Sequence, residues 1–196
     1  MNYKALTQQD LDNLFKGVNF HTKPMKHQLA TIAWAMDKDR VVCLHGIGTG
    51  KTKTALDLAW IWGMEKILVV CPNTVINSWI EQIKLHAPQF TFKVLKGTGK
   101  ERYFQMWNDT SNIHITNYEG LKNILGNKKT VENKFTGETK NKFVADWDIE
   151  IPYDCLIADE IHRFKDARTV QTKIGRIISA KCQKTIMLTG TPIGNS

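Results

Sequence analysis

The sequence has no apolar stretch long enough to cross a membrane. A spanning helix needs about 20 consecutive apolar residues, and no run in these 196 residues reaches that length. The first residues, Met1-Asn2-Tyr3-Lys4, lack the apolar segment of a signal peptide. These absences argue against a membrane or secreted protein. We therefore expect a cytoplasmic protein, in a bacterial or phage-infected cell, with no membrane partner.

Cysteine is scarce, and its spacing excludes the usual cysteine chemistry. The four cysteines form no CxxC pair, which argues against a zinc site or a disulfide framework. Three of them fall inside apolar runs, where a free thiol packs as a small apolar side chain. We predict that all four are packing residues: Cys43, Cys71, Cys155 and Cys182.

Acidic residues are outnumbered by basic ones. The chain has 27 Lys and Arg against 19 Asp and Glu, a net charge of +8, and a pI near 9.3. This balance favours a polyanionic partner, although a basic surface that only keeps the protein in solution is the alternative. Hydrophobic residues make up 42% of the chain, which is enough for the core of one sizeable domain.

Short apolar runs alternate with helical patterns along most of the chain. The spacing predicts helices over residues 7–15, 24–36, 52–62, 75–86, 101–107, 119–125 and 169–179. Strands are predicted over residues 41–44, 67–71, 90–95, 113–116, 155–158 and 185–188. This alternation predicts an α/β fold, with a mostly parallel sheet and helices on both faces. A helical segment, residues 1–22, would precede the main domain, residues 23–196.

One segment, about residues 126–151, interrupts this alternation. It is rich in Lys, Asn, Thr and Glu. Residues 135–138 are compatible with the turn of a small hairpin, and otherwise the segment is a mobile loop. Two functions fit its composition: a solvated insertion, or a basic flap that touches nucleic acid. The lysines concerned are Lys128, Lys129, Lys134, Lys140 and Lys142.

A glycine-rich turn, residues 46–52, follows the first predicted strand and opens a helix. Glycines let backbone N–H groups surround phosphate oxygens, and the helix start adds its positive dipole end. Lys51 is then placed for the β- and γ-phosphates of a nucleotide, and the Thr52 hydroxyl for Mg²⁺. We assign nucleotide binding to this turn, through Gly48, Thr49, Gly50, Lys51 and Thr52.

A second apolar strand, residues 155–158, runs into two adjacent carboxylates, Asp159 and Glu160. Nucleotide hydrolysis needs one carboxylate for the metal and another to orient and deprotonate the attacking water. We assign Asp159, together with Thr52, to Mg²⁺, and Glu160 to the water. Catalysis is expected to depend on Lys51, Asp159 and Glu160.

Six motifs in this order resemble the first RecA-like lobe of a superfamily 2 helicase, in the Swi/Snf branch of double-strand DNA translocases. The motifs are residues 23–28, 48–52, 69–74 with Trp79, 115–119, 159–162 and 188–193. The resemblance implies a RecA-like P-loop fold, ATP and Mg²⁺ as cofactors, and ATP hydrolysis coupled to movement on double-stranded DNA without sequence preference. His45 stands where the phosphate loop usually has glycine, and Ile161 where many relatives have Ala or Gly. Neither departure removes a group that touches phosphate or metal.

The resemblance also assigns roles outside the phosphate loop and the acidic pair. Gln28 would read the adenine edge, with an exposed helical glutamine as the alternative. Small polar residues after two strands would bind DNA phosphates, although turn formation explains them equally well: Asn73, Thr74, Thr116, Asn117 and Tyr118. His162, Thr189 and Thr191 would couple the nucleotide state to the cleft between the lobes. For the two threonines the alternative is that they only form the turn that follows a strand. A further patch is either phosphate-binding or a solvated face: Arg163, Lys165 and Arg168.

Members of this family carry a second RecA-like lobe with arginines that reach the γ-phosphate. No such motif lies within these 196 residues, so we expect a second lobe in cis, in a longer protein, or in trans. The lobe by itself should then be nearly inactive. A non-catalytic module that binds nucleotide, DNA or a partner is the alternative. The intact residues Lys51, Thr52, Asp159 and Glu160 favour the ATPase, and the motif at 189–192 disfavours a phosphate-loop kinase.

Overall fold

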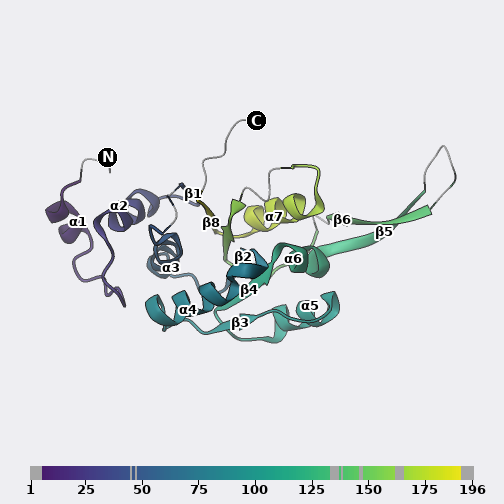
Figure 1. Cartoon of the computed structure of the whole chain (residues 1–196), viewed down its shortest axis with the longest axis horizontal. Coiled ribbons are helices and arrows are strands. Elements are labelled where there is room, and N and C mark those ends of the chain that lie inside the picture. The colour runs from purple at the N-terminus through teal and green to yellow at the C-terminus, as the bar shows by residue number, and fades with distance from the viewer. Residues whose placement is uncertain are drawn as a thin grey trace.

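The computed structural model describes residues 6–44, 46, 48–132, 137, 139–145, 148–161 and 166–190. Its centre is a six-stranded sheet of order β1-β8-β7-β2-β4-β3, in which every pairing is parallel (Figure 1). The strands are β1 (Arg40–Leu44), β2 (Ile67–Cys71), β3 (Phe92–Val94), β4 (Ile113–Asn117), β7 (Cys155–Asp159) and β8 (Lys184–Thr189). The predicted α/β fold with a mostly parallel sheet is confirmed.

The helices lie where the sequence predicts them. They are α1 (Gln8–Leu14), α2 (Lys26–Ala35), α3 (Lys51–Ile61), α4 (Ile76–His86), α5 (Gly99–Asn108), α6 (Tyr118–Leu125) and α7 (Val170–Lys181). Helix α1 packs against α2. A short 3₁₀ turn, η2 (Asn73–Val75), precedes α4. Among the described residues, no helix has both the length and the apolar character that a bilayer crossing demands.

Local hydrogen bonds explain where several helices begin. Thr7 and Asp10 form a capping box at the start of α1, and Thr98 and Glu101 form another at the start of α5. Such caps satisfy backbone N–H groups that have no partner within the helix. Helix α2 begins two residues later than predicted, because Met25 adopts an extended conformation and serves as its N-cap.

Two apolar layers cover the two faces of the sheet, because successive strand residues point in opposite directions. Ile67, Val69 and Cys71 of β2 pack with side chains of α2, α3 and α4. Leu68 and Val70 of the same strand pack with side chains of α5, α6 and α7. A strand buried on both faces reads as a continuous apolar run, and the predicted placement of helices on both faces is confirmed.

The four cysteines are free and buried, as predicted. Burial raises the pKa of the Cys43 thiol to about 11 and that of Cys182 to about 12. Both thiols therefore stay protonated at neutral pH and act as packing groups.

The lysine-rich insertion forms a two-stranded antiparallel hairpin, so the alternative of a mobile loop is wrong for its described residues. Its strands are β5 (Gly126–Glu132) and β6 (Thr139–Ala145), with Gly126 opposite Ala145 at the base. The hairpin is larger than the short turn suggested, and it projects from the body of the protein beside α6 and α7 (Figure 1). Because an isolated hairpin is marginal in water, contacts with these helices at its base are expected to stabilise it.

Two valines in the same sheet provide a test of where its stability lies. Val69 in β2 is fully buried, whereas Val42 in the edge strand β1 is 42% exposed. Val69→Ala should lower the free energy of unfolding by about 2 kcal/mol or more, through lost burial and a residual cavity. Val42→Ala should change it by about 0.5 kcal/mol. Urea denaturation measures both, and equal losses would contradict the described core.

Candidate functional site

The carboxyl ends of neighbouring strands bring the predicted motifs to one edge of the sheet. Leu44, at the end of β1, lies opposite Thr189 of β8, and Leu188 lies opposite Asp159 of β7. In the described sheet, β8 therefore lies between β1, which leads into the glycine-rich loop, and β7, which leads into the acidic pair. The next strands, β2 and β4, end at Cys71 and Asn117 in register with each other. This is the edge at which parallel sheets bind ligands.

The glycine-rich loop leads directly into α3. Two of its residues, His45 and Ile47, lie outside the described part of the chain. Gly48 and Gly50 have φ angles of 78° and 76°, which residues with a Cβ rarely adopt. The carbonyl of Gly46 accepts hydrogen bonds from Thr49 Oγ1 (2.9 Å) and from Lys51 Nζ (3.1 Å). The Lys51 ammonium group is thus held over the loop itself, followed in α3 by the half-buried Thr52.

Gln28 is 3% exposed, so the alternative of an exposed helical glutamine is wrong. Its Oε1 accepts the N–H of Met25 (2.8 Å), and its Nε2 donates to the carbonyls of Thr49 (3.3 Å) and Gly50 (3.4 Å). His27 Nε2 lies 2.9 Å from the same Thr49 carbonyl. A Cβ at Gly50 would collide with the Gln28 amide nitrogen. Glycine is therefore favoured there by the backbone angle, a substituted residue would displace the Gln28 amide, and these hydrogen bonds tie α2 to the loop.

Asp159 is buried and receives a hydrogen bond from a tryptophan. Its Oδ2 accepts from Nε1 of Trp79, on α4, at 2.9 Å, and Trp79 is 1% exposed. Burial raises the pKa of the Asp159 carboxyl, while the Trp79 hydrogen bond and the nearby charge of Lys51 favour its charged form. Sequence reasoning noted Trp79 as part of a motif but assigned it no contact. The contact joins residues 80 positions apart, which no local pattern reveals.

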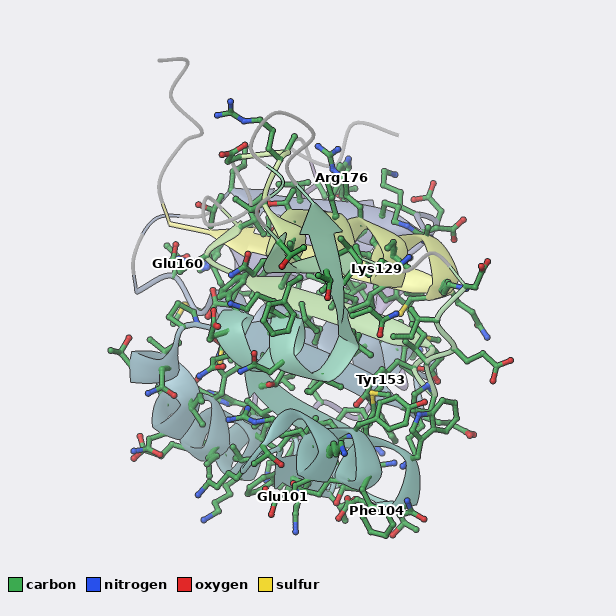
Figure 2. All side chains as sticks on the ribbon, turned by 90° about the vertical axis from the view of Figure 1, so that its right-hand side faces the viewer. Glu101, Phe104, Lys129, Tyr153, Glu160 and Arg176 are labelled. Atoms are coloured by element: carbon green, nitrogen blue, oxygen red, sulfur yellow. The ribbon has the colours of Figure 1, made fainter. Side chains whose placement is uncertain are left out.

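The backbone at the acidic pair has an unusual conformation. Glu160 has a φ of 56°, and among the described residues it is the only non-glycine residue with a positive φ. Such conformations cost about 1–3 kcal/mol and concentrate at functional sites. The Tyr118 hydroxyl donates to the Asp159 carbonyl and lies 3.4 Å from the Glu160 carbonyl. In Figure 2, Glu160 lies beyond one side of the sheet and Tyr153, which precedes β7, lies toward the other.

The predicted DNA-binding residues fall into two groups, of which the first lies at the surface. Asn73 and Thr74 are exposed in η2, at the end of β2. Asn117 Nδ2 donates to Asn73 Oδ1 (3.2 Å), and Asn117 Oδ1 accepts the N–H of Gly120 (2.6 Å) and so caps α6. Asn73, Asn117 and Tyr118 line a pocket of about 360 Å³, here called the strand-end pocket. Both explanations of Asn117, turn formation and phosphate binding, remain compatible with this geometry.

Thr116 forms the second group. Its side chain is fully buried, and its hydroxyl accepts a hydrogen bond from Arg102 Nη1 (3.3 Å). Contact between this side chain and DNA would require the end of β4 to rearrange.

Among the coupling candidates, Thr189 is 1% exposed at the end of β8, where it lies opposite Leu44, the last residue of β1. The others, His162 and Thr191, lie outside the described residues, as do Arg163 and Lys165.

The donor atoms at the sheet edge suit a hard cation. Within the described parts of the chain, no group of three or more His, Cys, Asp and Glu side chains forms a metal-binding cluster. Mg²⁺ is usually bound through one or two carboxylates together with substrate phosphates. The Asp159 carboxylate and the Thr52 hydroxyl provide oxygen ligands of that kind, so these residues fit Mg²⁺ held jointly with a nucleotide.

Comparison with known proteins gives one family. A family model described as "SNF2-related domain" matches residues 27–196. "DNA repair and recombination protein RAD54B" of Mus musculus is 26% identical over 172 residues, covering 82% of this chain and 17% of that protein. "Protein CHROMATIN REMODELING 19" of Arabidopsis thaliana is 22% identical over 214 residues, covering 98% of this chain and 26% of that protein. The chain thus spans about a quarter or less of the length of these two relatives.

A solved structure shares the fold. "Sulfolobus solfataricus SWI2/SNF2 ATPase core in complex with dsDNA" matches with a TM-score of 0.65 and 21% identity, over 91% of this chain and 34% of that one. At this level of identity the likeness establishes the α/β fold. The relatives named here lend no support to the bacterial or phage-infected setting, which stays a prediction.

The hydrogen bond from Trp79 to Asp159 can be measured as a coupling energy. Trp79→Phe should lower the free energy of unfolding by about 1–3 kcal/mol, because a buried carboxylate loses its donor. The smaller ring also leaves a cavity, so the same change is made in an Asp159→Ala background, where only the cavity cost remains.

Urea denaturation of the wild type, the two single variants and the double variant gives the coupling energy between Trp79 and Asp159. Trp107→Phe, at an indole that is 42% exposed on α5, is the control and should change stability by about 0.5 kcal/mol. An identical cost of Trp79→Phe in both backgrounds would show that the hydrogen bond contributes nothing.

Proposed function

Since this chain belongs to the SNF2-related domain family, we propose that it is the ATP-binding lobe of a Swi/Snf-type DNA-dependent ATPase. The lobe would couple ATP hydrolysis to movement on DNA when joined to a second lobe, in cis or in trans. One observation carries the proposal: the loop that bears Lys51 and the Asp159–Glu160 pair lie at the same sheet edge, separated by β8 alone. A purely structural domain has no need of this combination.

The glycine-rich loop would bind the nucleotide phosphates. The backbone N–H groups of Gly48, Thr49 and Gly50 precede α3, whose N-terminal dipole favours an anion. Lys51 already lies over the loop, so it would exchange one partner, the Gly46 carbonyl, for phosphate oxygens.

Gln28 would couple nucleotide recognition to the conformation of this loop. Its amide is engaged by Met25 and by the carbonyls of Thr49 and Gly50. A contact with adenine would therefore release or share at least one of these hydrogen bonds. The geometry supports a glutamine that responds to the base and holds the phosphate loop at the same time.

Hydrolysis would depend on the acidic pair. Thr52 and Asp159 would hold Mg²⁺, which when bound neutralises charge on the phosphates. The Trp79 hydrogen bond engages Oδ2 of Asp159, so the other carboxylate oxygen would be the one offered to Mg²⁺. Glu160 would orient the attacking water and accept its proton. The Tyr118 hydroxyl supports the backbone from which this carboxylate projects.

DNA phosphates would lie along the ends of β2 and β4. Asn73, Thr74 and Asn117 offer amide and hydroxyl groups that bind phosphates without reading bases. The similar Sulfolobus ATPase core is in complex with double-stranded DNA, and this supports a duplex as the partner here. His162, Thr189 and Thr191 would transmit the nucleotide state to the second lobe, and the protein would work in the cytoplasm.

Calorimetry of ATP with Mg²⁺ tests the phosphate loop. We expect weak binding, because one lobe provides only half of the cleft. Lys51→Ala should weaken it by about tenfold or more, since a hydrogen bond to a charged group contributes about 1.5–3 kcal/mol. Lys16→Ala, an exposed lysine beyond α1, is the control. Equal affinities for the wild type and Lys51→Ala would contradict the assignment, as would no binding by either at millimolar ATP.

Phosphate release tests the dependence on a second lobe. Residues 1–196 alone should hydrolyse ATP very slowly, with or without duplex DNA, because arginines supplied to the γ-phosphate contribute about 10³–10⁵-fold in related reactions. In a two-lobe form, Glu160→Gln should retain ATP binding and lose turnover. Rapid DNA-stimulated hydrolysis by residues 1–196 would show that the second lobe is dispensable.

A further inference from the structure

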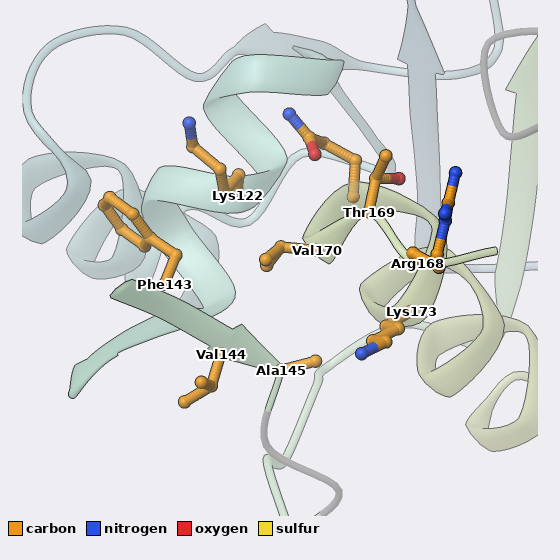
Figure 3. Close-up of a pocket in the computed structure, with 9 residues that line it drawn as sticks. Lys122, Phe143, Val144, Ala145, Arg168, Thr169, Val170 and Lys173 are labelled. Carbon is orange, nitrogen blue, oxygen red and sulfur yellow. The ribbon is translucent and has the colours of Figure 1, made fainter. Parts of the chain in front are cut away.

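A second pocket lies beside the candidate site, between the hairpin and the helices beneath it. Its volume is about 620 Å³, within the range of about 300–1,000 Å³ that is typical of ligand pockets. The pocket is surrounded by Lys122 of α6, Phe143 of β6, Arg168 in the segment before α7, and Lys173 of α7 (Figure 3). This cavity is called the hairpin pocket below.

The lining of the hairpin pocket is cationic. Lys122, Arg168 and Lys173 contribute to its wall, and among the described residues that line it there is no Asp or Glu. The Lys122 ammonium lies 5.0 Å from the centre of the Phe143 ring, a cation–π contact that holds the charge at the base of the hairpin. The insertion thus contributes an aromatic side chain that fixes a positive charge supplied by α6.

Two of these cations already have carboxylate partners at the surface. Lys122 forms an ion pair with Glu119, and Arg168 forms one with Asp166. The side chains of Glu119 and Asp166 are 59% and 48% exposed. Exposed ion pairs contribute little to stability and are screened by salt. A phosphate group that reaches the pocket can therefore compete with these carboxylates.

The hairpin pocket continues into the strand-end pocket. Thr169 and Gln171 line both cavities. The strand-end pocket is lined by Asn73, Asn117 and Tyr118, three of the residues that the family resemblance assigns to DNA, and by Glu119, the ion-pair partner of Lys122. A single polar surface therefore runs from the ends of β2 and β4, across the seam between α6 and α7, to the base of the hairpin.

We propose that the hairpin pocket binds the phosphate backbone of duplex DNA as it leaves the strand-end pocket. The inserted hairpin then extends the DNA-binding surface of the lobe. This inference rests on the proposed function, since it takes DNA as the partner. Charge complementarity and the continuity of the two pockets favour a long polyanion. Lys129 on β5 is also exposed (Figure 2) and adds positive charge to the hairpin itself.

A phosphate contact in the hairpin pocket would make the insertion a basic flap that touches nucleic acid rather than a solvated insertion. The main contact would lie at the base of the hairpin, on Lys122 and Lys173 of the flanking helices, rather than on the lysines near the turn.

The test compares two double variants with the same loss of charge. Lys122→Gln with Lys173→Gln removes two cations of the hairpin pocket. Lys16→Gln with Lys181→Gln removes two exposed lysines elsewhere, at the ends of α1 and α7. Fluorescence anisotropy follows a labelled duplex of arbitrary sequence from about 50 to 200 mM salt, where each phosphate contact adds roughly −0.9 to the slope of log affinity against log salt. The slope should shrink by about 1–2 in the pocket variant and stay unchanged in the control.

Several results would overturn the proposal. Equal slopes for the pocket variant and the wild type would leave the hairpin a solvated insertion, while salt-dependent binding by the wild type would still support the proposed function. Equal reductions in both double variants would show a general effect of charge. No binding by the wild type, or tight binding that ignores salt, would instead contradict the proposed function itself.

The pocket variant could also loosen the hairpin, because Lys122 contacts Phe143. Circular dichroism and the thermal midpoint check the fold. Lys173→Gln alone changes an exposed side chain of α7 and should reduce the salt slope by about 0.9. An unchanged slope in this folded single variant would also count against the proposal.

Discussion

The hydrogen bond from the Trp79 indole to the buried Asp159 carboxylate is the contact on which the site depends. A carboxylate with 9% exposure is costly unless it is hydrogen-bonded, and α4 supplies the donor from one face of the sheet. From the other face, Tyr118 at the start of α6 donates to the backbone of the same acidic pair. The two helical layers therefore clamp the end of β7, and this explains how Glu160 is held in a left-handed conformation.

The phosphate loop is secured in a comparable way. The buried amide of Gln28 in α2 donates hydrogen bonds to the carbonyls of Thr49 and Gly50. A helix that precedes the sheet therefore helps to hold the loop in its conformation. Strand β8 lies between this loop and the acidic pair, and its last residue, Thr189, is buried between them. Movement of β8 would therefore affect both halves of the site, which supports a coupling role for the motif that follows this strand.

The hairpin is an addition outside the sheet and its two helical layers. Its base packs near α6 and α7, where the strand-end and hairpin pockets share Thr169 and Gln171. The acidic pair and the proposed DNA surface meet at Tyr118, which lines the strand-end pocket and hydrogen-bonds to Asp159. A ligand in that pocket would contact a residue that supports the backbone of the acidic pair, and this offers a physical route between the proposed DNA surface and the proposed hydrolytic site.

Apolar runs, turn residues and capping pairs such as Thr98 with Glu101 were enough to predict the order and type of the elements, because periodicity and capping are local properties. The glycine-rich loop and the Asp159–Glu160 pair were also evident from the sequence. The tertiary structure alone decided that Gln28 is buried, that Thr116 faces Arg102, and that the insertion is a long hairpin. It also decided the partner of Asp159, because that contact joins residues 80 positions apart and depends on how α4 packs against the sheet.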